Sequence, residues 1–185
     1  MSVSGSIPFI LFGFGIVDSF FESMSGITTT GATVIAGLDD LPKSLLIYRQ
    51  LLQWLGGMGL IVLAIAVMPL LGIGGGQLFK TQTPGPMSEQ RLTPRITSTA
   101  RALWSIYFVL TVLCIFAYRL AGMSYFDAVS HAFSTVSIGG FSTHDLSIGF
   151  FDSLSIEIVC ITFMLLSAMS FAVHYSAIYL SLIHI

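Results

Sequence analysis

The sequence predicts an all-α membrane protein, from its composition, its long uncharged stretches and an internal repeat. Of its 185 residues, 55% are hydrophobic and 9% are charged, and the mean hydropathy is +0.91. Soluble domains average about 25% charged residues. Residues 51–79 and 103–118 contain no charged side chain, and about 20 apolar residues let a helix cross a bilayer. The net charge of −2 gives no indication of nucleic-acid binding.

Long and short helices are expected to alternate along the chain. Full spans are predicted over 45–71, 102–121 and 153–180, and short helices over 16–27 and 125–135. Residues 1–15 are apolar but too short to cross a membrane alone. The chain ends in an apolar segment with no polar flank, so we expect it to be part of a longer protein.

Basic residues predict the orientation of the loops. The loop 77–101 contains Lys80, Arg91, Arg95 and Arg101 against a single acid, Glu89. The positive-inside rule places such a loop in the cytoplasm. The loops 34–44 and 142–153 are more acidic and would then lie on the periplasmic or extracellular side.

The polar run "TTTGATV" after the first short helix has a counterpart later in the chain. With an offset of 109 residues, "DSFFESMSGITTTGATV" (18–34) aligns with "DAVSHAFSTVSIGGFST" (127–143). Aspartate, serine and glycine are identical in the pairs Asp18/Asp127, Ser25/Ser134 and Gly31/Gly140. Each copy follows an apolar segment and precedes an acidic loop and a full span. Internal repeats of this kind are common in transport proteins.

The repeating unit is a span, a short helix, a polar glycine-containing strand and a second span. A helix of about 11 residues reaches about 16 Å, roughly half the hydrocarbon thickness. Non-helical backbone at that depth is tolerated only where it is buried in protein or lines a water-filled path. The carbonyl end of the helix dipole favours a cation, and rings of backbone carbonyls replace the hydration shell of potassium in channel filters.

Several motifs together resemble the Trk/Ktr/HKT superfamily, and within it the bacterial Trk-type potassium uptake subunits. They are "TTTGATV", "RQLLQWLGGMGLIVLAIAVMPLLGIGGGQLF", "TPGP", "LTPRI" and "LAGMSYFDAVSHAFSTVSIGGFSTHD". The resemblance implies four potassium-channel-like repeats around one pore, of which this chain would hold the first two. The division is then 1–76 for the first pore-loop repeat, 77–101 for the cytoplasmic loop and 102–185 for the second repeat.

On this resemblance, backbone carbonyls of two filter segments would bind potassium as the substrate. The filter residues implied are Thr28, Thr29, Thr30 and Gly31 in the first copy, and Ser137, Ile138, Gly139 and Gly140 in the second. Whether Gly139 or Gly140 corresponds to Gly31 stays open, because two glycines are adjacent. The residues expected to support the filters or to line the outer mouth are Glu22, Thr33, His131, Phe141, His144 and Asp145.

Other polar residues have simpler interpretations. Glu22 and His131 occupy equivalent positions of the two short helices, so a buried support role is expected for both. Arg49 and Arg119 lie near span ends, and we expect them to extend towards the membrane interface. The glycines of "LGGMG" (55–59) are expected to permit close helix packing.

Two other classes of function remain open from the residues alone. A secondary transporter for another cation, coupled to sodium or protons, would need a relay of intramembrane carboxylates. A membrane-embedded hydrolase would need a Ser/His pair converging across helices, and "STHD" (142–145) contains those residue types. We expect neither enzymatic activity nor an organic cofactor. The resemblance further implies a bacterial cytoplasmic membrane location, a homodimer in the lipid bilayer, and a cytosolic nucleotide-binding (RCK/TrkA-like) regulatory partner near 77–101.

Overall fold

The computed structural model describes residues 2–67 and 92–169, with side chains described over 2–59, 101 and 103–169. The regular elements of these ranges are helical. They are α1 (Ser2–Leu11), α2 (Ile16–Ile27), η1 (Leu38–Asp40), α3 (Lys43–Val67), α5 (Leu92–Leu120), α6 (Tyr125–Val136), η3 (Ser147–Phe151) and α7 (Leu154–Ala168). The predicted all-α fold is therefore confirmed.

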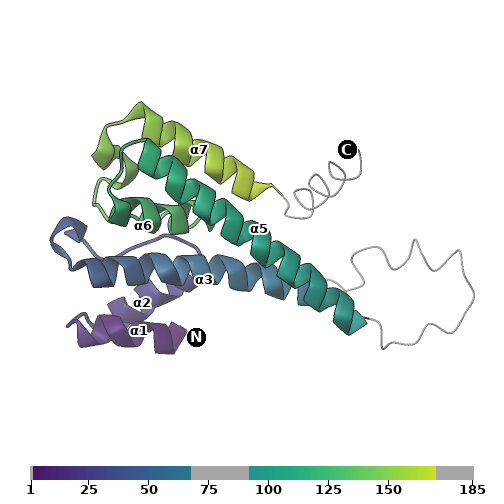
Figure 1. The fold of residues 1–185 in the computed structure, drawn as a ribbon. Coiled ribbons are helices and arrows are strands. Elements are labelled where there is room, and N and C mark those ends of the chain that lie inside the picture. Colours follow the sequence, from purple (N-terminus) through teal and green to yellow (C-terminus); the bar gives the residue numbers. More distant parts are fainter. Residues whose placement is uncertain (1, 68–91, 170–185) are drawn as a thin grey trace, which may run out of the picture.

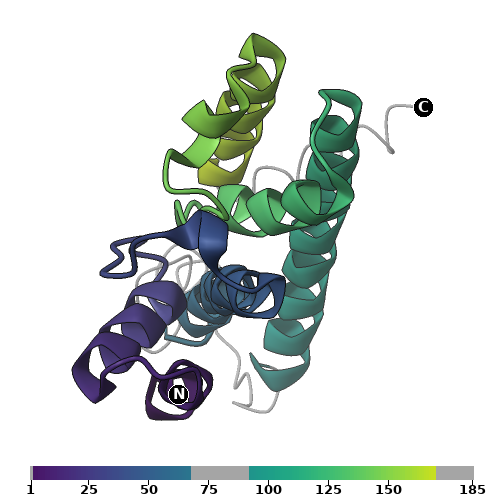
Figure 2. The same cartoon turned by 90° about the vertical axis from the view of Figure 1, so that its left-hand side faces the viewer.

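The helices fall into two similar halves, each built from a helix, a short helix, an extended segment and a further helix (Figure 1). The first half comprises α1, α2 and α3, and the second comprises α5, α6 and α7. Helix α3 packs against α1 and α2 of its own half and also against α5 and α6 of the other. Figure 2, viewed along α3, shows this helix between α2 and α6. It is the element that joins the halves.

The two short helices lie where the sequence predicts them. Helix α2 covers 16–27 as expected, and α6 extends one residue beyond the predicted end at 135. Ser124 caps the start of α6, because its hydroxyl accepts from the Asp127 N–H at 3.1 Å and donates to the Asp127 carboxylate at 2.6 Å. Local sequence patterns suffice to place both helices, although only α6 has a side-chain cap at its start.

Helix α5 is longer than the predicted span. It begins at Leu92, so the last ten residues of the predicted 77–101 loop, 92–101, are helical, which corrects that boundary. Pro94 is compatible with the first helical turn because N–H groups there have no acceptor within the helix. At about 1.5 Å per residue, the 29 residues of α5 extend about 43 Å, beyond the about 30 Å hydrocarbon core.

One stretch of the described chain, Leu103–Leu120 within α5, is long and apolar enough to cross a membrane by length and composition. Helices α1 and α7 are shorter apolar helices. The predicted spans 45–71 and 153–180 correspond to α3 and α7, and their predicted C-terminal parts, 68–71 and 170–180, lie outside the described residues. So do the exit 72–76 and residues 77–91 of the loop.

Two clusters of buried apolar side chains form the core of the described helices. One contains Phe9, Leu38 and Leu45, and the other contains Tyr107, Tyr118 and further side chains of α5, α6 and α7. By contrast, large apolar side chains on the outer faces of α5 and α7 are exposed in the described chain. They include Phe108, Val109, Leu113, Phe116, Ile158, Ile161 and Leu165.

Gly56 and Gly57 of α3 lie at close contacts between elements, whereas a Cβ added to Gly59 would meet nothing within 4 Å. A Cβ added to Gly56 would overlap the Ile27 carbonyl, and one added to Gly57 would lie 2.9 Å from the Tyr107 hydroxyl and 3.0 Å from the Ser137 Cβ. The end of α2 and the segment after α6 thus both pack directly on α3. The prediction of close packing at 55–59 is confirmed for these two positions.

Candidate ion-binding site

The short helices end in the same backbone turn. After α2, the N–H of Thr30 donates to the Ser25 carbonyl and that of Thr29 to Gly26, at 2.9 and 3.0 Å. After α6, Gly139 donates to Ser134 and Ile138 to Thr135, at 2.9 and 3.1 Å. Both patterns are Schellman motifs, in which the residue after the C-cap is left-handed. Each donor and acceptor of the second motif lies 109 positions after its counterpart in the first.

The left-handed position of each motif is occupied by a β-branched residue. Thr29 has φ +54° and Ile138 has φ +55°. This region is unfavourable for side chains branched at Cβ, and strained backbone of this kind clusters at functional sites. Both halves thus place a β-branched residue in the same unfavourable conformation at equivalent positions. This indicates that the turn has the same role in each half.

The backbone also establishes which second glycine corresponds to Gly31. Gly31 has φ +76° and Gly140 has φ +83°, while Gly139 is not among the positive-φ glycines of the described chain. Gly31 and Gly140 are therefore equivalent in conformation as well as in the 109-residue alignment. We refer to residues 28–34 and 137–143 as the first and second segments.

Most carbonyl groups of the predicted filter residues accept no hydrogen bond from the described part of the protein. Thr28, Thr30, Ile138 and Gly140 are exposed, so this part of the backbone lies at the surface of the described chain. Within the described residues, no hydrogen bond to the protein is found for the carbonyl oxygens of Thr28, Thr29, Thr30, Gly31, Ser137, Ile138 and Gly140. The Gly139 carbonyl differs, because it accepts from the Gln53 side chain at 2.9 Å.

Each segment is bonded to its short helix by a hydroxyl group at an equivalent position. The Thr33 hydroxyl donates to the Glu22 carboxylate at 2.9 Å, and the equivalent Ser142 hydroxyl bonds to His131 Nε2 at 2.9 Å. Each hydroxyl also accepts a backbone N–H two residues on, from Ile35 and His144 respectively, at 3.1 Å. The side chains of Glu22 and His131 are buried. The structure thus places both residues behind their segments, as the alignment suggests.

The Ser142–His131 pair has the residue types of a hydrolase but the surroundings of a structural contact. His131 Nδ1 lies 2.9 Å from the Asp127 carbonyl oxygen, which can only accept, so a neutral ring uses Nε2 to accept from Ser142. Ser142 is only 5% exposed and His131 only 2%, so the hydroxyl is closed to a substrate. Glu22 and Thr33 occupy the equivalent positions in the first half, where the same contact has no catalytic chemistry.

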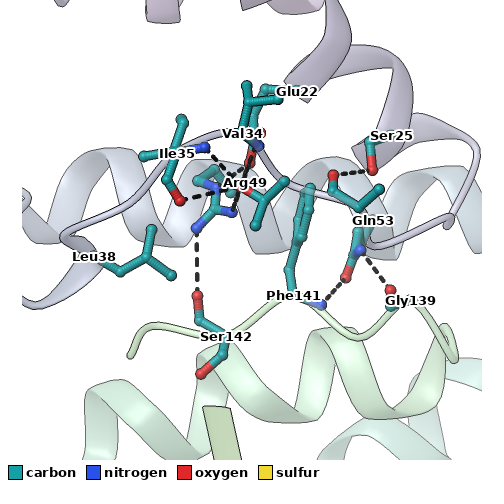
Figure 3. Close-up of polar contacts among 12 residues, drawn as sticks. Glu22, Ser25, Val34, Ile35, Leu38, Arg49, Gln53, Gly139, Phe141 and Ser142 are labelled. Carbon is teal, nitrogen blue, oxygen red and sulfur yellow. Dashed lines mark hydrogen bonds and ion pairs between the residues drawn. The ribbon is translucent and has the colours of Figure 1, made fainter. Parts of the chain in front are cut away.

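Arg49 of α3 joins the two segments, and Figure 3 shows its guanidinium between them. It pairs with Glu22 at 2.6 Å, donates to the Thr33 hydroxyl at 3.0 Å, and reaches the Ser142 carbonyl at 3.4 Å. Its guanidinium also lies 4.4 Å from the centre of the Phe141 ring. The side chain is 0% exposed, so the prediction that Arg49 extends to the interface is wrong. The Glu22 carboxylate holds it inside.

Gln53, one helical turn after Arg49, is a site residue that sequence reasoning missed. Its side chain is buried and bonds to the backbone of the second segment at Gly139 and Phe141, at 2.9 and 3.1 Å (Figure 3). A signal was present, because Arg49 and Gln53 are polar residues four apart in a predicted apolar span and so lie on one face of the helix. Arg119, in contrast, is exposed at the end of α5 and donates to the Met123 carbonyl at 2.9 Å.

The predicted outer-mouth residues join the outer loops of the two halves. Asp145 accepts from the N–H groups of Gly37 and Leu38 at 3.1 Å, and His144 bonds to Asp39. This bond holds the pKa of Asp39 below its usual value. The His144 ring stacks on Phe150, with the ring centroids 3.5 Å apart. Both residues therefore contact the first half from the second, and their role in attracting cations stays a prediction.

Comparison with known proteins relates this geometry to a family. Residues 5–184 match the family model TrkH, described as a cation transport protein. The chain belongs to the TrkH family of cation transport proteins. It is therefore a membrane protein.

Relatives within the TrkH family are similar along almost the whole chain. The Trk system potassium uptake protein TrkH of Halomonas elongata is 58% identical over 96% of this chain, and that of Escherichia coli K12 is 53% identical over 93%. The crystal structure of the potassium transporter TrkH from Vibrio parahaemolyticus matches with TM-score 0.81 and 52% identity over 95% of this chain. The chain covers 37%, 36% and 35% of these proteins, respectively.

Proposed function

We propose that the chain forms two walls of a potassium-conducting pore, with the first and second segments as parts of its selectivity filter. The unpaired carbonyl oxygens of both segments carry this proposal, because they follow equivalent turns and have no protein partner within the described residues. Carbonyl oxygens at the end of a helix attract a cation and can replace its water shell. Potassium would be bound by Thr28–Gly31 and by Ser137–Gly140.

The choice of potassium rests on the relatives, which are named potassium uptake proteins. Potassium would be the substrate, and the backbone would bind it without an organic cofactor. No covalent step is implied, so the chain would act as a transporter and not as an enzyme. The residue division 1–76, 77–101 and 102–185 would then separate two pore-loop repeats and a loop, with the corrected start of α5 at Leu92.

A carbonyl filter explains the described residues better than a carboxylate relay does. A transporter coupled through carboxylates needs acidic side chains that can change their protonation state during transport. Glu22 is the buried acidic residue closest to the segments, and it is neutralised by Arg49 at 2.6 Å and bonded by Thr33 at 2.9 Å. Its contacts therefore suit support better than proton transfer.

The location and partners follow the same proposal. The protein would lie in the bacterial cytoplasmic membrane, with 77–101 on the cytoplasmic side and with 34–44 and 142–153 outside. The relatives are named as parts of a Trk system, and we propose a homodimer regulated by a cytosolic nucleotide-binding protein of the RCK/TrkA type docked near 77–101. The exposed apolar side chains of α5 and α7 would face lipid or other helices.

The test uses a hybrid transporter, in which this chain replaces the matching segment of the Halomonas elongata relative. Gly31→Ser and Gly140→Ser each place a side chain on a backbone with positive φ. We expect both variants to lose the preference for potassium over sodium in vesicle uptake assays, because the carbonyl groups can no longer keep their positions. Unchanged potassium and sodium fluxes in both variants would refute the filter.

A further inference from the structure

The side chain of Gln53 connects the first half of the chain to the backbone of the second segment. Its Nε2 donates to the Gly139 carbonyl at 2.9 Å, and its Oε1 accepts from the Phe141 N–H at 3.1 Å. These bonds flank Gly140 on both sides, and Figure 3 shows the amide reaching both atoms from α3. Gln53 is 0% exposed, so water cannot readily replace it.

The backbone of the second segment packs closely against the Gln53 amide group. A Cβ added to Gly139 would overlap the amide group of Gln53, and a Cβ added to Gly31 would overlap the Gly139 carbonyl. The Gln53 amide, Gly139 and Gly31 are therefore packed directly against one another, and a larger residue at either glycine would separate them. The contact spans both halves and both segments.

We propose that Gln53 is a positioning residue of the filter, which fixes the two peptide groups on either side of Gly140. This inference rests on the proposed function and deepens it, because it assigns part of the ion selectivity to a side chain of α3. Gly139 and Gly140 have no side chains to anchor them, and glycine backbone is the most conformationally free. The Gln53 amide supplies the missing anchor, so the first half determines the carbonyl geometry of the second.

The loss of Gln53 has a definite physical consequence. Both the Gly139 carbonyl and the Phe141 N–H would be left unpaired in a buried place, which is unfavourable. The peptide groups would rotate to find other partners, and the neighbouring Gly140 carbonyl would move with them. A filter that depends on the spacing and field strength of its carbonyl groups would then distinguish potassium from sodium less well.

The first experiment tests the two hydrogen bonds of Gln53 to the second segment without measuring transport. In the hybrid transporter, Gln53→Met keeps a similar side-chain length and removes both hydrogen bonds. Hydrogen exchange followed by mass spectrometry should show faster exchange over residues 139–143 than in the parent hybrid. The control is Gln50→Met, since Gln50 is also a buried glutamine of α3 but has no hydrogen-bond partner within the described residues. Equal exchange in Gln53→Met and the parent would overturn the inference.

The second experiment measures selectivity in the same variants. We expect Gln53→Met to reduce the ratio of potassium to sodium uptake about tenfold at equal protein amount, as the loss of one or two buried hydrogen bonds suggests. Gln50→Met should keep the parental ratio. A merely structural role for Gln53 would lower both fluxes in proportion and leave the ratio unchanged, and that result would overturn the inference.

Two further variants separate the possible failures. Gly140→Ser is measured in parallel. If it loses selectivity while Gln53→Met keeps it, only this inference fails, whereas if Gly31→Ser and Gly140→Ser both keep selectivity, the proposed function itself has failed. Should Gln53→Met not assemble, Gln53→Glu retains the acceptor for Phe141 and removes the donor to Gly139. It is expected to lower the ratio as well, and an unchanged ratio would count against the inference in the same way.

Discussion

The two halves hold equivalent hydroxyl groups in place with different side chains. In the first, the hydroxyl of Thr33 is held by a charged pair, Glu22 and Arg49, that is 0% exposed. In the second, the hydroxyl of Ser142 is held by His131, which bonds onward to a backbone carbonyl. The turns, the left-handed residues and the hydroxyl positions are the same in both. What the repeats share is therefore the backbone and its hydroxyl anchor, while the group behind the anchor differs.

The difference extends to the helix that follows each segment. Helix α3 carries Arg49 and Gln53, which bond to both segments. Helix α7 instead presents Cys160 and Met164 to a cavity of about 120 Å³ beside the second segment. The second segment thus takes part of its polar support from α3 of the first half, and the two halves are not independent units. A segment of one sequence repeat can therefore be held in place by side chains of the other repeat.

The largest effect is expected from breaking the charged pair of the first half. Arg49→Met leaves Glu22 buried without its cation, and the loss of one partner of a buried pair costs about 3–5 kcal/mol. The double variant Arg49→Met with Glu22→Gln should regain most of this loss, because no charge is left unpaired. Equilibrium unfolding of the hybrid transporter in lipid–detergent micelles measures both.

The control for this prediction is Arg119→Met. Arg119 is an exposed arginine at the end of α5, and its removal should cost less than about 1 kcal/mol. If Arg49→Met were no worse than Arg119→Met, or if the double variant were no better than the single one, the distinction between a charged and a neutral support would not hold.

A second prediction compares the equivalent glycines. Both have positive φ, but a Cβ on Gly31 would overlap the Gly139 carbonyl whereas a Cβ on Gly140 would meet open space. Gly140→Ala should cost about 1–2 kcal/mol for the left-handed backbone, and Gly31→Ala about 2–4 kcal/mol because the overlap adds to it. The same unfolding measurement ranks them.

Gly37→Ala is a matched control for the backbone effect alone, since Gly37 has φ +75° and open space around it. Its cost should resemble that of Gly140→Ala. Equal costs for Gly31→Ala and Gly140→Ala would show that the contact between the segments is not close in solution.

A third prediction concerns the neutral support of the second half, for which a smaller effect than that of the charged pair is expected. His131→Phe keeps a ring of similar size and removes the bond to Ser142, so the hydroxyl loses a buried partner at a cost of about 1–3 kcal/mol. The loss in unfolding free energy should be smaller than that of Arg49→Met, because no charge is stranded. A loss as large as that of Arg49→Met would contradict the comparison.

Much of the fold was predictable because its signals are local. The positions of α2 and α6 follow from short apolar patterns, and the 109-residue repeat pairs the first glycine-containing segment with the second. The roles of Glu22 and His131 behind the segments follow from the same alignment, because equivalent positions of equivalent helices face the same way. The start of α5 at Leu92 was missed because the residues before 102 are polar and basic, which is typical of a loop but also of a helix extending beyond the membrane.

The sequence by itself determined the helical class, the repeat and the place where each short helix gives way to extended backbone. Periodicity, composition and glycine positions act over a few residues, so they can be read along the chain. Only the tertiary structure decided that Arg49 is buried on Glu22, that Gln53 holds Gly139, and that Gly140 and not Gly139 repeats the conformation of Gly31. Contacts such as Gln53 to Gly139 join residues 86 positions apart. Their geometry depends on how α3 packs between the two halves, and no local sequence pattern indicates this packing.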